Sequence, residues 1–269
     1  MKSRSSHVYK YKTMNNIKSI ITGLVVITMM ASSCRHILPP KEVKSDINDT
    51  IVAASFTGVK KYFSEGRLIK EVTFKDGIKD GLCKNYYDDG RLKTTIIYRN
   101  NIKADTSKWY YPEGGVYRAT PYKNGKVDGI QKKYYKNGRL QAELPYSNGF
   151  RKPGLKEYFE DGRELTSSVK IVAEINDSYY KSHSKIRVIL KLSNDSKNVE
   201  FYKGTLSDGA FNPDKCKKVT ISSGMGYFEL TTDPVNGRGY VDVIAVYSSR
   251  FRNKAIITKR IKLPYNNLY

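Results

Sequence analysis

A lysine stands two residues before a tyrosine at five places in the chain, and the Lys-x-Tyr pairs follow one another at a constant interval. Successive side chains of a β-strand point to opposite faces, so residues two apart share a face. Lysine supplies positive charge, and tyrosine supplies a large amphipathic surface that is favoured at interfaces. The pattern predicts that an acidic partner binds along a stripe of Lys60, Tyr62, Lys84, Tyr86, Lys108, Tyr110, Lys132, Tyr134, Lys156 and Tyr158.

A plainer interpretation of the stripe stays open. The lysines would solvate an exposed face, and the tyrosines would pack on their repeat neighbours as a cross-strand ladder. With two strands per repeat, successive lysines would lie roughly 10 Å apart. That spacing is close to the Debye length at physiological salt, so the lysines would act as partly independent charges.

Residues with catalytic potential are few. The three histidines, His7, His36 and His183, are not paired by spacing with a nucleophile, and no nucleotide-binding or zinc-protease motif occurs. The cysteines form no CxxC and no Cys/His cluster, so a structural zinc site has no ligands. We therefore expect no catalytic residue, no cofactor and no metal, and we predict that the protein is not an enzyme.

The strands that position the stripe are predicted from the residues that form turns between them. At nine expected turn positions between residues 65 and 162, an acidic or amide residue precedes Gly eight times, and Asn100-Asn101 takes the ninth place. Gly adopts positive φ without steric cost, and Asn is its best substitute. Such pairs between short alternating runs are a strong hairpin signal. The prediction is an all-β chain whose residues 57–165 form an elongated antiparallel meander of 24-residue hairpin repeats.

The repeated motif YY-x-x-G-R-L…Y-x-N-G-x-x-D-G resembles the bacterial variant of the MORN (membrane occupation and recognition nexus) repeat, whose bacterial members are often labelled antitoxin-like. The resemblance implies a twisted sheet that binds proteins or lipids and has no activity of its own. The second glycine of the motif is present as Gly81 and Gly129. The motif departs at Asp105 and Pro153, which predicts bent or loosely paired third and last units.

The 24-residue period ends after Leu165, and residues 166–269 predict an immunoglobulin-like β-sandwich. The expectation rests on architecture alone, because the Cys…Trp…Cys signature of true immunoglobulin domains is missing. Seven short alternating segments are expected as strands: 168–175, 185–192, 198–206, 217–222, 226–232, 239–248 and 254–263.

The N-terminal segment predicts export. A basic start, a short apolar run and small residues lead into Cys34, which resembles a relaxed bacterial lipobox. We expect residues 1–33 to be a lipoprotein signal peptide, Cys34 to be lipidated and residues 34–56 to be a tether. An uncleaved signal anchor and a buried N-terminal helix are the alternatives. Cys83 and Cys216 would then remain, and we expect them to be unpaired, although an oxidising compartment permits a disulfide.

The predicted export also affects what the net positive charge of the chain indicates about its partners. Removal of residues 1–33 takes away five Lys/Arg and lowers the formal net charge from +22 to +17. We expect a lipid-anchored protein of the bacterial envelope, at the outer membrane, with Arg35-His36 favouring the periplasmic side. The expected partner is an envelope protein or an anionic lipid or glycan, not nucleic acid. The alternatives are an immunity lipoprotein that captures an exported toxin and an enzyme acting on peptidoglycan.

Overall fold

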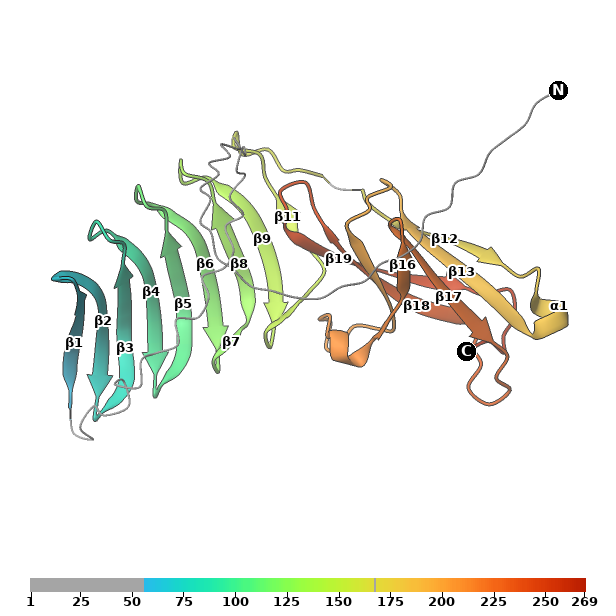
Figure 1. Ribbon diagram of the computed structural model, residues 1–269, viewed down its shortest axis with the longest axis horizontal. Coiled ribbons are helices and arrows are strands. Elements are labelled where there is room, and N and C mark those ends of the chain that lie inside the picture. Colours follow the sequence, from blue (N-terminus) through green and yellow to red (C-terminus); the bar gives the residue numbers. More distant parts are fainter. Residues whose placement is uncertain (1–55, 167) are drawn as a thin grey trace, which may run out of the picture. The chain divides into compact units, whose positions relative to one another are not determined.

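The computed structural model describes residues 56–166 and 168–269, which are almost entirely strands and turns (Figure 1). The predicted signal peptide, Cys34 and nearly all of the predicted tether lie outside the described residues. Within the described residues, no helix is both long enough and apolar enough to span a membrane.

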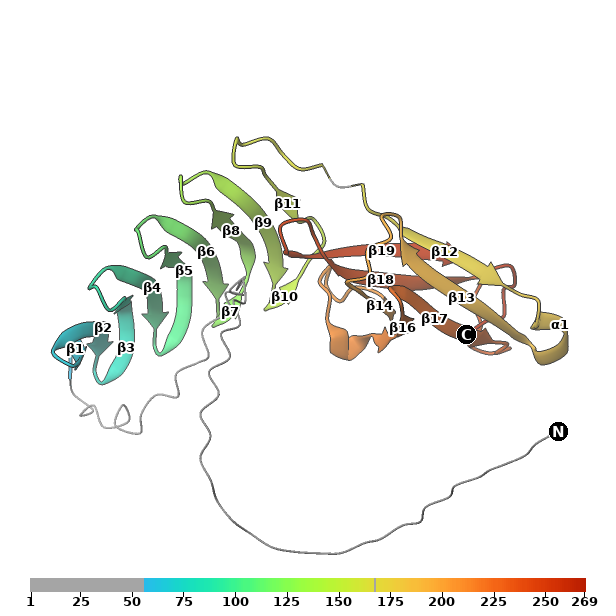
Figure 2. The ribbon, with the colours of Figure 1, turned by 45° about the horizontal axis from the view of Figure 1, so that its top comes forward.

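The repeats form one antiparallel sheet in which strands that follow one another along the chain lie side by side (Figure 2). The fold class predicted for residues 57–165, an antiparallel meander, is confirmed. The strands are β1 (Gly58–Ser64), β2 (Arg67–Lys75), β3 (Ile78–Tyr86), β4 (Leu92–Arg99), β5 (Ile102–Tyr110), β6 (Val116–Lys123), β7 (Lys126–Val127), β8 (Gly129–Tyr134), β9 (Leu140–Ser147), β10 (Phe150–Arg151) and β11 (Lys156–Glu157).

The second glycine of the motif is needed for a bulge in the sheet. Gly81 has a φ of +114°, and a Cβ atom there would lie 3.0 Å from the side chain of Thr73. Asp105 meets the same demand with a φ of +51°, so β5 runs without a break and the third unit stays paired. The last unit is loosely paired as expected: β10 and β11 both pair with β9, and residues 152–155 separate them.

The C-terminal part consists of two four-stranded antiparallel sheets, ordered β12-β13-β17-β16 and β15-β14-β18-β19. Both sheets contribute to one apolar core, in which Val188, Leu190, Phe201, Val243 and Ala245 are fully buried. The strands are β12 (Ile171–Asn176), β13 (Lys185–Leu192), β14 (Val199–Lys203), β15 (Lys217–Lys218), β16 (Thr220–Ser222), β17 (Met225–Thr231), β18 (Tyr240–Ser248) and β19 (Lys254–Lys262), with helix α1 (Tyr180–His183) and a 3-10 turn (Pro213–Lys215) in the connections.

One predicted strand of this part is divided. The segment 217–222 was expected to be a single strand, but β15 pairs with β14 in one sheet and β16 pairs with β17 in the other. Val219 lies between them and is buried in the common core. Period-2 alternation identifies an extended segment, but it carries no information on which sheet the segment joins.

A buried polar cluster joins the last repeat to the hairpin between β18 and β19. Glu157 is only 5% exposed, and its carboxylate accepts hydrogen bonds of 2.6 Å from both Ser249 and Asn253. The Lys133 ammonium donates to Asn253 Oδ1 at 2.6 Å. Burial and the nearby Arg151 and Arg118 charges lower the pKa of Lys133. The four side chains therefore satisfy one another, as buried polar groups must.

Candidate binding surface

A row of directly paired residues crosses the repeat sheet from β1 to β11. Residues directly opposite each other in antiparallel strands share a face, so the whole row lies on one face of the sheet. Every second member is a lysine, and the members between the lysines are acidic or short. This lysine row consists of Lys61, Glu71, Lys84, Thr95, Lys108, Ala119, Lys132, Glu143 and Lys156.

The first unit departs from the predicted stripe. Lys60 pairs with Val72 on the opposite face, and Lys61 takes its place in the row opposite Glu71. Tyr62 also lies on the opposite face, where it packs near buried Val72. The prediction that all five Lys-x-Tyr pairs share a face is therefore corrected: the pairs that begin at Lys84, Lys108, Lys132 and Lys156 share it, and the pair at Lys60 does not.

The cause is the length of the first turn. Ser64 pairs with Arg67 across a two-residue turn. In the next unit the Tyr87 N–H donates to the carbonyl of Arg91, which leaves three residues between them. A shift of one residue turns every side chain of a strand to the other face. The spacing of the Lys-x-Tyr pairs along the sequence is the same in both units, so it does not reveal how many residues form each turn.

Glu71 places a carboxylate between two lysines at one end of the lysine row. Its carboxylate lies 3.6 Å from the Lys61 ammonium and 3.5 Å from that of Lys84, and it accepts a 2.7 Å hydrogen bond from the Tyr86 hydroxyl. The Tyr86 hydrogen bond is the main cause of a lowered Glu71 pKa, and the two lysines lower it further. Burial and the Glu71 contact raise the pKa of Tyr86 to about 12. Glu71 is therefore ionised and Tyr86 is neutral at physiological pH.

Glu143 occupies the equivalent place at the other end. Its carboxylate lies 3.5 Å from Lys132, and it accepts a 3.4 Å hydrogen bond from Tyr158. Glu143 also pairs in register with Lys156. Burial, and then the Glu143 charge, raise the pKa of Tyr158. Each end of the row is thus a carboxylate held by lysine and by the tyrosine of the Lys-x-Tyr pair that follows it along the chain.

The centre of the row has no acid. The positions equivalent to Glu71 and Glu143 in the middle units are Thr95 and Ala119, which both pair with Lys108. Lys108 is exposed, and within the described residues it takes part in no ion pair. Lys108 is therefore the one lysine of the row that pairs in register with no carboxylate.

Comparison with known protein families identifies the repeat. Residues 79–100, 106–124 and 127–148 match the model described as MORN repeat variant. We call these segments MORN-type because of that similarity. No curated protein matches the chain as a relative. The matched segments lie in the middle of the repeat sheet, and they include the part of the lysine row from Lys84 to Glu143.

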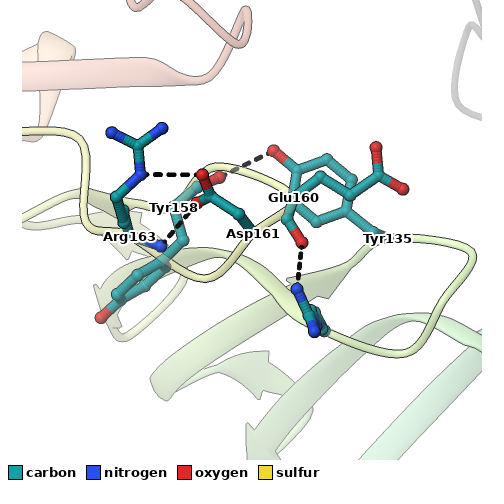
Figure 3. Close-up of polar contacts among 6 residues, drawn as sticks. Tyr135, Tyr158, Glu160, Asp161 and Arg163 are labelled. Carbon is teal, nitrogen blue, oxygen red and sulfur yellow. Dashed lines mark hydrogen bonds and ion pairs between the residues drawn. The ribbon is translucent and has the colours of Figure 1, made fainter.

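The second tyrosine of each pair joins one MORN-type repeat to the next. The hydroxyls of Tyr87, Tyr111 and Tyr135 donate to the backbone carbonyls of Tyr110, Tyr134 and Tyr158, at 2.7, 2.6 and 2.7 Å. Figure 3 shows the last of these bonds beside the turn in which Asp161 accepts two hydrogen bonds from Arg163. The regularly spaced aromatic pairs are the signal of this role in the sequence, but strand alternation alone does not predict it. The hydroxyls of these tyrosines therefore connect neighbouring repeats.

The opposite face of the MORN-type sheet is its buried face. Val72, Cys83, Ser107, Thr120 and Ala142 are all less than 5% exposed. Further along this face, the Arg118 guanidinium stacks over the Trp109 ring at 4.1 Å. Because this face is occupied by the packing of the repeats themselves, the lysine row is the face that the sheet offers to a partner.

The other candidate residues do not assemble into a site. Within residues 56–166 and 168–269, no group of three or more His, Cys, Asp and Glu is placed to hold a metal. His183 lies at the end of α1 with Nδ1 2.8 Å from its neighbour Ser182. Cys83 belongs to the repeat sheet and Cys216 packs near Tyr202 in the C-terminal part, so the two cysteines lie in different cores.

Proposed function

We propose that this protein is a non-enzymatic binding or scaffold protein, anchored to the bacterial envelope by a lipid on Cys34, whose repeat sheet docks an acidic partner along the lysine row. The observation that carries the proposal is the centre of the row. Lys108 is exposed, pairs in register with Thr95 and Ala119, and takes part in no ion pair among the described residues, whereas Lys84 and Lys132 on either side of it form ion pairs with Glu71 and Glu143.

The architecture supports the same function. In a MORN-type sheet each repeat contacts only its neighbours, so the number of repeats sets the length of the surface. One face is consumed by internal packing, and the other presents lysine and tyrosine at regular intervals. A surface of this kind favours electrostatic recognition, which contributes to association rate and specificity more than to raw affinity.

The test uses the lysines whose loss leaves the internal ion pairs intact. Lys108 and Lys156 have no ion pair within the described residues, so Lys108→Glu with Lys156→Glu removes none of the lysines that form ion pairs with Glu71 or Glu143. The matched control reverses two exposed lysines of the C-terminal part, Lys181→Glu with Lys262→Glu.

Both variants and the unmodified protein are used to capture partners from native envelopes, and bound species are identified by mass spectrometry. We expect a partner that the control retains and the Lys108/Lys156 variant loses. Identical captured species from all three proteins would contradict docking through the row. An exported toxin among the lost species would favour the immunity function.

The anchor is tested separately. Metabolic labelling with an alkyne fatty acid should label the unmodified protein, and Cys34→Ala should abolish the label and release the protein from the membrane fraction. Labelling that persists in Cys34→Ala would contradict the proposed anchor. Protease treatment of intact cells would then report which side of the outer membrane the protein occupies.

A further inference from the structure

Two positions in the lysine row keep all the groups that hold a carboxylate but lack the carboxylate itself. At Glu71 these groups are Lys61, which precedes it in the row, and Lys84, which follows it. The third group is Tyr86, the tyrosine of the Lys-x-Tyr pair that begins at Lys84. At Glu143 the same three places are taken by Lys132, Lys156 and Tyr158. The repeat therefore defines a standard environment for one acidic group.

The middle units repeat this environment around side chains that are too short or uncharged. Thr95 pairs with Lys84 and Lys108, and the tyrosine of the following Lys-x-Tyr pair is Tyr110. Ala119 pairs with Lys108 and Lys132, and the corresponding tyrosine is Tyr134. Neither Thr95 nor Ala119 supplies a negative charge, so Lys108 stands between two incomplete positions.

Resting on the proposed function, we infer that the places above Thr95 and Ala119 bind two carboxylates of one acidic polypeptide segment. The two places are separated by two strands, which is about 10 Å. The chemistry of the ligand follows from the neighbouring units: two ammonium groups and a phenol hold the Glu71 carboxylate, and one ammonium group and a phenol hold that of Glu143.

A polypeptide fits this surface better than a membrane does. A flat anionic bilayer would contact the whole row and would meet the negative charges of Glu71 and Glu143 at its two ends. A segment that reaches only the central units avoids both acids and contacts the unneutralised Lys108. Like charges that are brought together cost binding energy and so exclude partners, which is how charge patterns confer specificity.

The inference is tested by replacing the two residues at these places with glutamate, so that the protein's own carboxylates occupy them. Thr95→Glu with Ala119→Glu adds the missing carboxylates and removes no lysine. Thr95→Gln with Ala119→Gln is the uncharged control of similar size. Thr220→Glu with Ser222→Glu is the control for net charge, since both residues are exposed on β16 in the C-terminal part. The probes are a fluorescein-labelled oligomer of poly-L-glutamate and vesicles that contain phosphatidylglycerol.

We expect the filled variant to bind poly-L-glutamate at least tenfold more weakly than either control does, and to melt at a higher temperature than the Gln variant. Equal binding by the filled variant and the net-charge control overturns the inference, and so does equal melting of the Glu and Gln variants. Binding of vesicles but not of poly-L-glutamate by the unmodified protein also overturns it, in favour of a lipid partner.

The same assay separates this inference from the proposed function. If Lys108→Glu with Lys156→Glu weakens binding of poly-L-glutamate but the filled variant does not, the row docks acidic partners and the two central places are not where the carboxylates bind. If neither variant changes binding, docking through the row fails as a whole.

Discussion

Glu71 shows how one residue converts a repeated pattern into a defined charge distribution. It lies between two lysines that belong to different strands, and the hydroxyl of Tyr86 donates to it. The lysines of the row are alike in the sequence, but their surroundings differ according to whether the residue paired with them is Glu, Thr or Ala. The residue between the lysines, more than the lysines themselves, decides where the surface is positive.

Replacement of Glu71 should have a pH-dependent effect on stability. The pKa of Glu71 is lowered from 4.5, so its stabilising contribution is present above that value and is lost as the pH falls through the folded-state pKa. We expect Glu71→Gln to reduce the free energy of unfolding by about 1 kcal/mol at pH 7. Urea unfolding as a function of pH measures this, and an equal deficit at acid and neutral pH would contradict the assignment.

The tyrosine bonds between repeats make a second prediction at the level of single residues. Tyr135→Phe removes the hydroxyl that donates to the Tyr158 carbonyl and leaves the ring in place. Since a typical intramolecular hydrogen bond contributes about 1 kcal/mol, the variant should lose about that much stability. Tyr179→Phe is the control, because Tyr179 is 60% exposed. Equal unfolding midpoints for the two variants would argue that the Tyr135 hydroxyl does not hold the repeats together.

At the scale of the element, backbone conformation decides which residues reach which face. The bulge at Gly81 and the two-residue turn after Ser64 both change the register of a strand relative to its neighbour. The bulge at Gly81 can be predicted from the sequence, because a glycine within a strand, here in Asp80-Gly81, often marks a bulge. The two-residue turn cannot, since Glu65-Gly66 resembles the later turns in composition.

The glycine of the bulge should be far less replaceable than a glycine of the exposed turns. Gly81→Ala meets both a positive φ and the side chain of Thr73, whereas Gly90→Ala meets a positive φ of +81° with no atom within 4 Å. We expect Gly81→Ala to lose about 1–3 kcal/mol more stability than Gly90→Ala loses. Thermal or urea unfolding of the pair decides this, and equal losses would mean that the bulge is not tightly packed.

Across the described residues as a whole, side chains of the last repeat contact the hairpin of β18 and β19. Phe159 meets Phe251 edge to face with ring centres 5.8 Å apart, beside the buried Glu157 and Asn253. The hairpin therefore covers the end of the repeat sheet, where the buried face would otherwise continue into solvent. Terminal capping of this kind is what repeat arrays need for solubility.

Asn253→Ala should separate the unfolding of the two parts. The change removes the neutral side chain that hydrogen-bonds both the Glu157 carboxylate and the Lys133 ammonium, and a hydrogen bond to a charged group contributes about 1.5–3 kcal/mol. Trp109 is the single tryptophan and lies in the repeat sheet, so its fluorescence reports that part alone. We expect fluorescence and far-UV circular dichroism to give noncoincident transitions in the variant.

Asn194→Ala, which changes an exposed asparagine of the C-terminal part, is the matched control and should leave the two transitions as they are in the unmodified protein. Coincident transitions in Asn253→Ala would show that the cluster does not couple the repeat sheet to the C-terminal part.

The strands, the turns and the repeat can be predicted from the amino-acid sequence, because they depend on local chemistry: glycine and asparagine at positive φ, and alternation along each strand. The same alternation places Lys84, Lys108, Lys132 and Lys156 on one face. The three-dimensional structure was needed to see that Lys60 leaves this face, that 217–222 divides between two sheets, and that Glu157 meets Asn253. Each of these depends on register or on contact between distant segments, and a one-residue shift reverses every side chain without altering the sequence pattern.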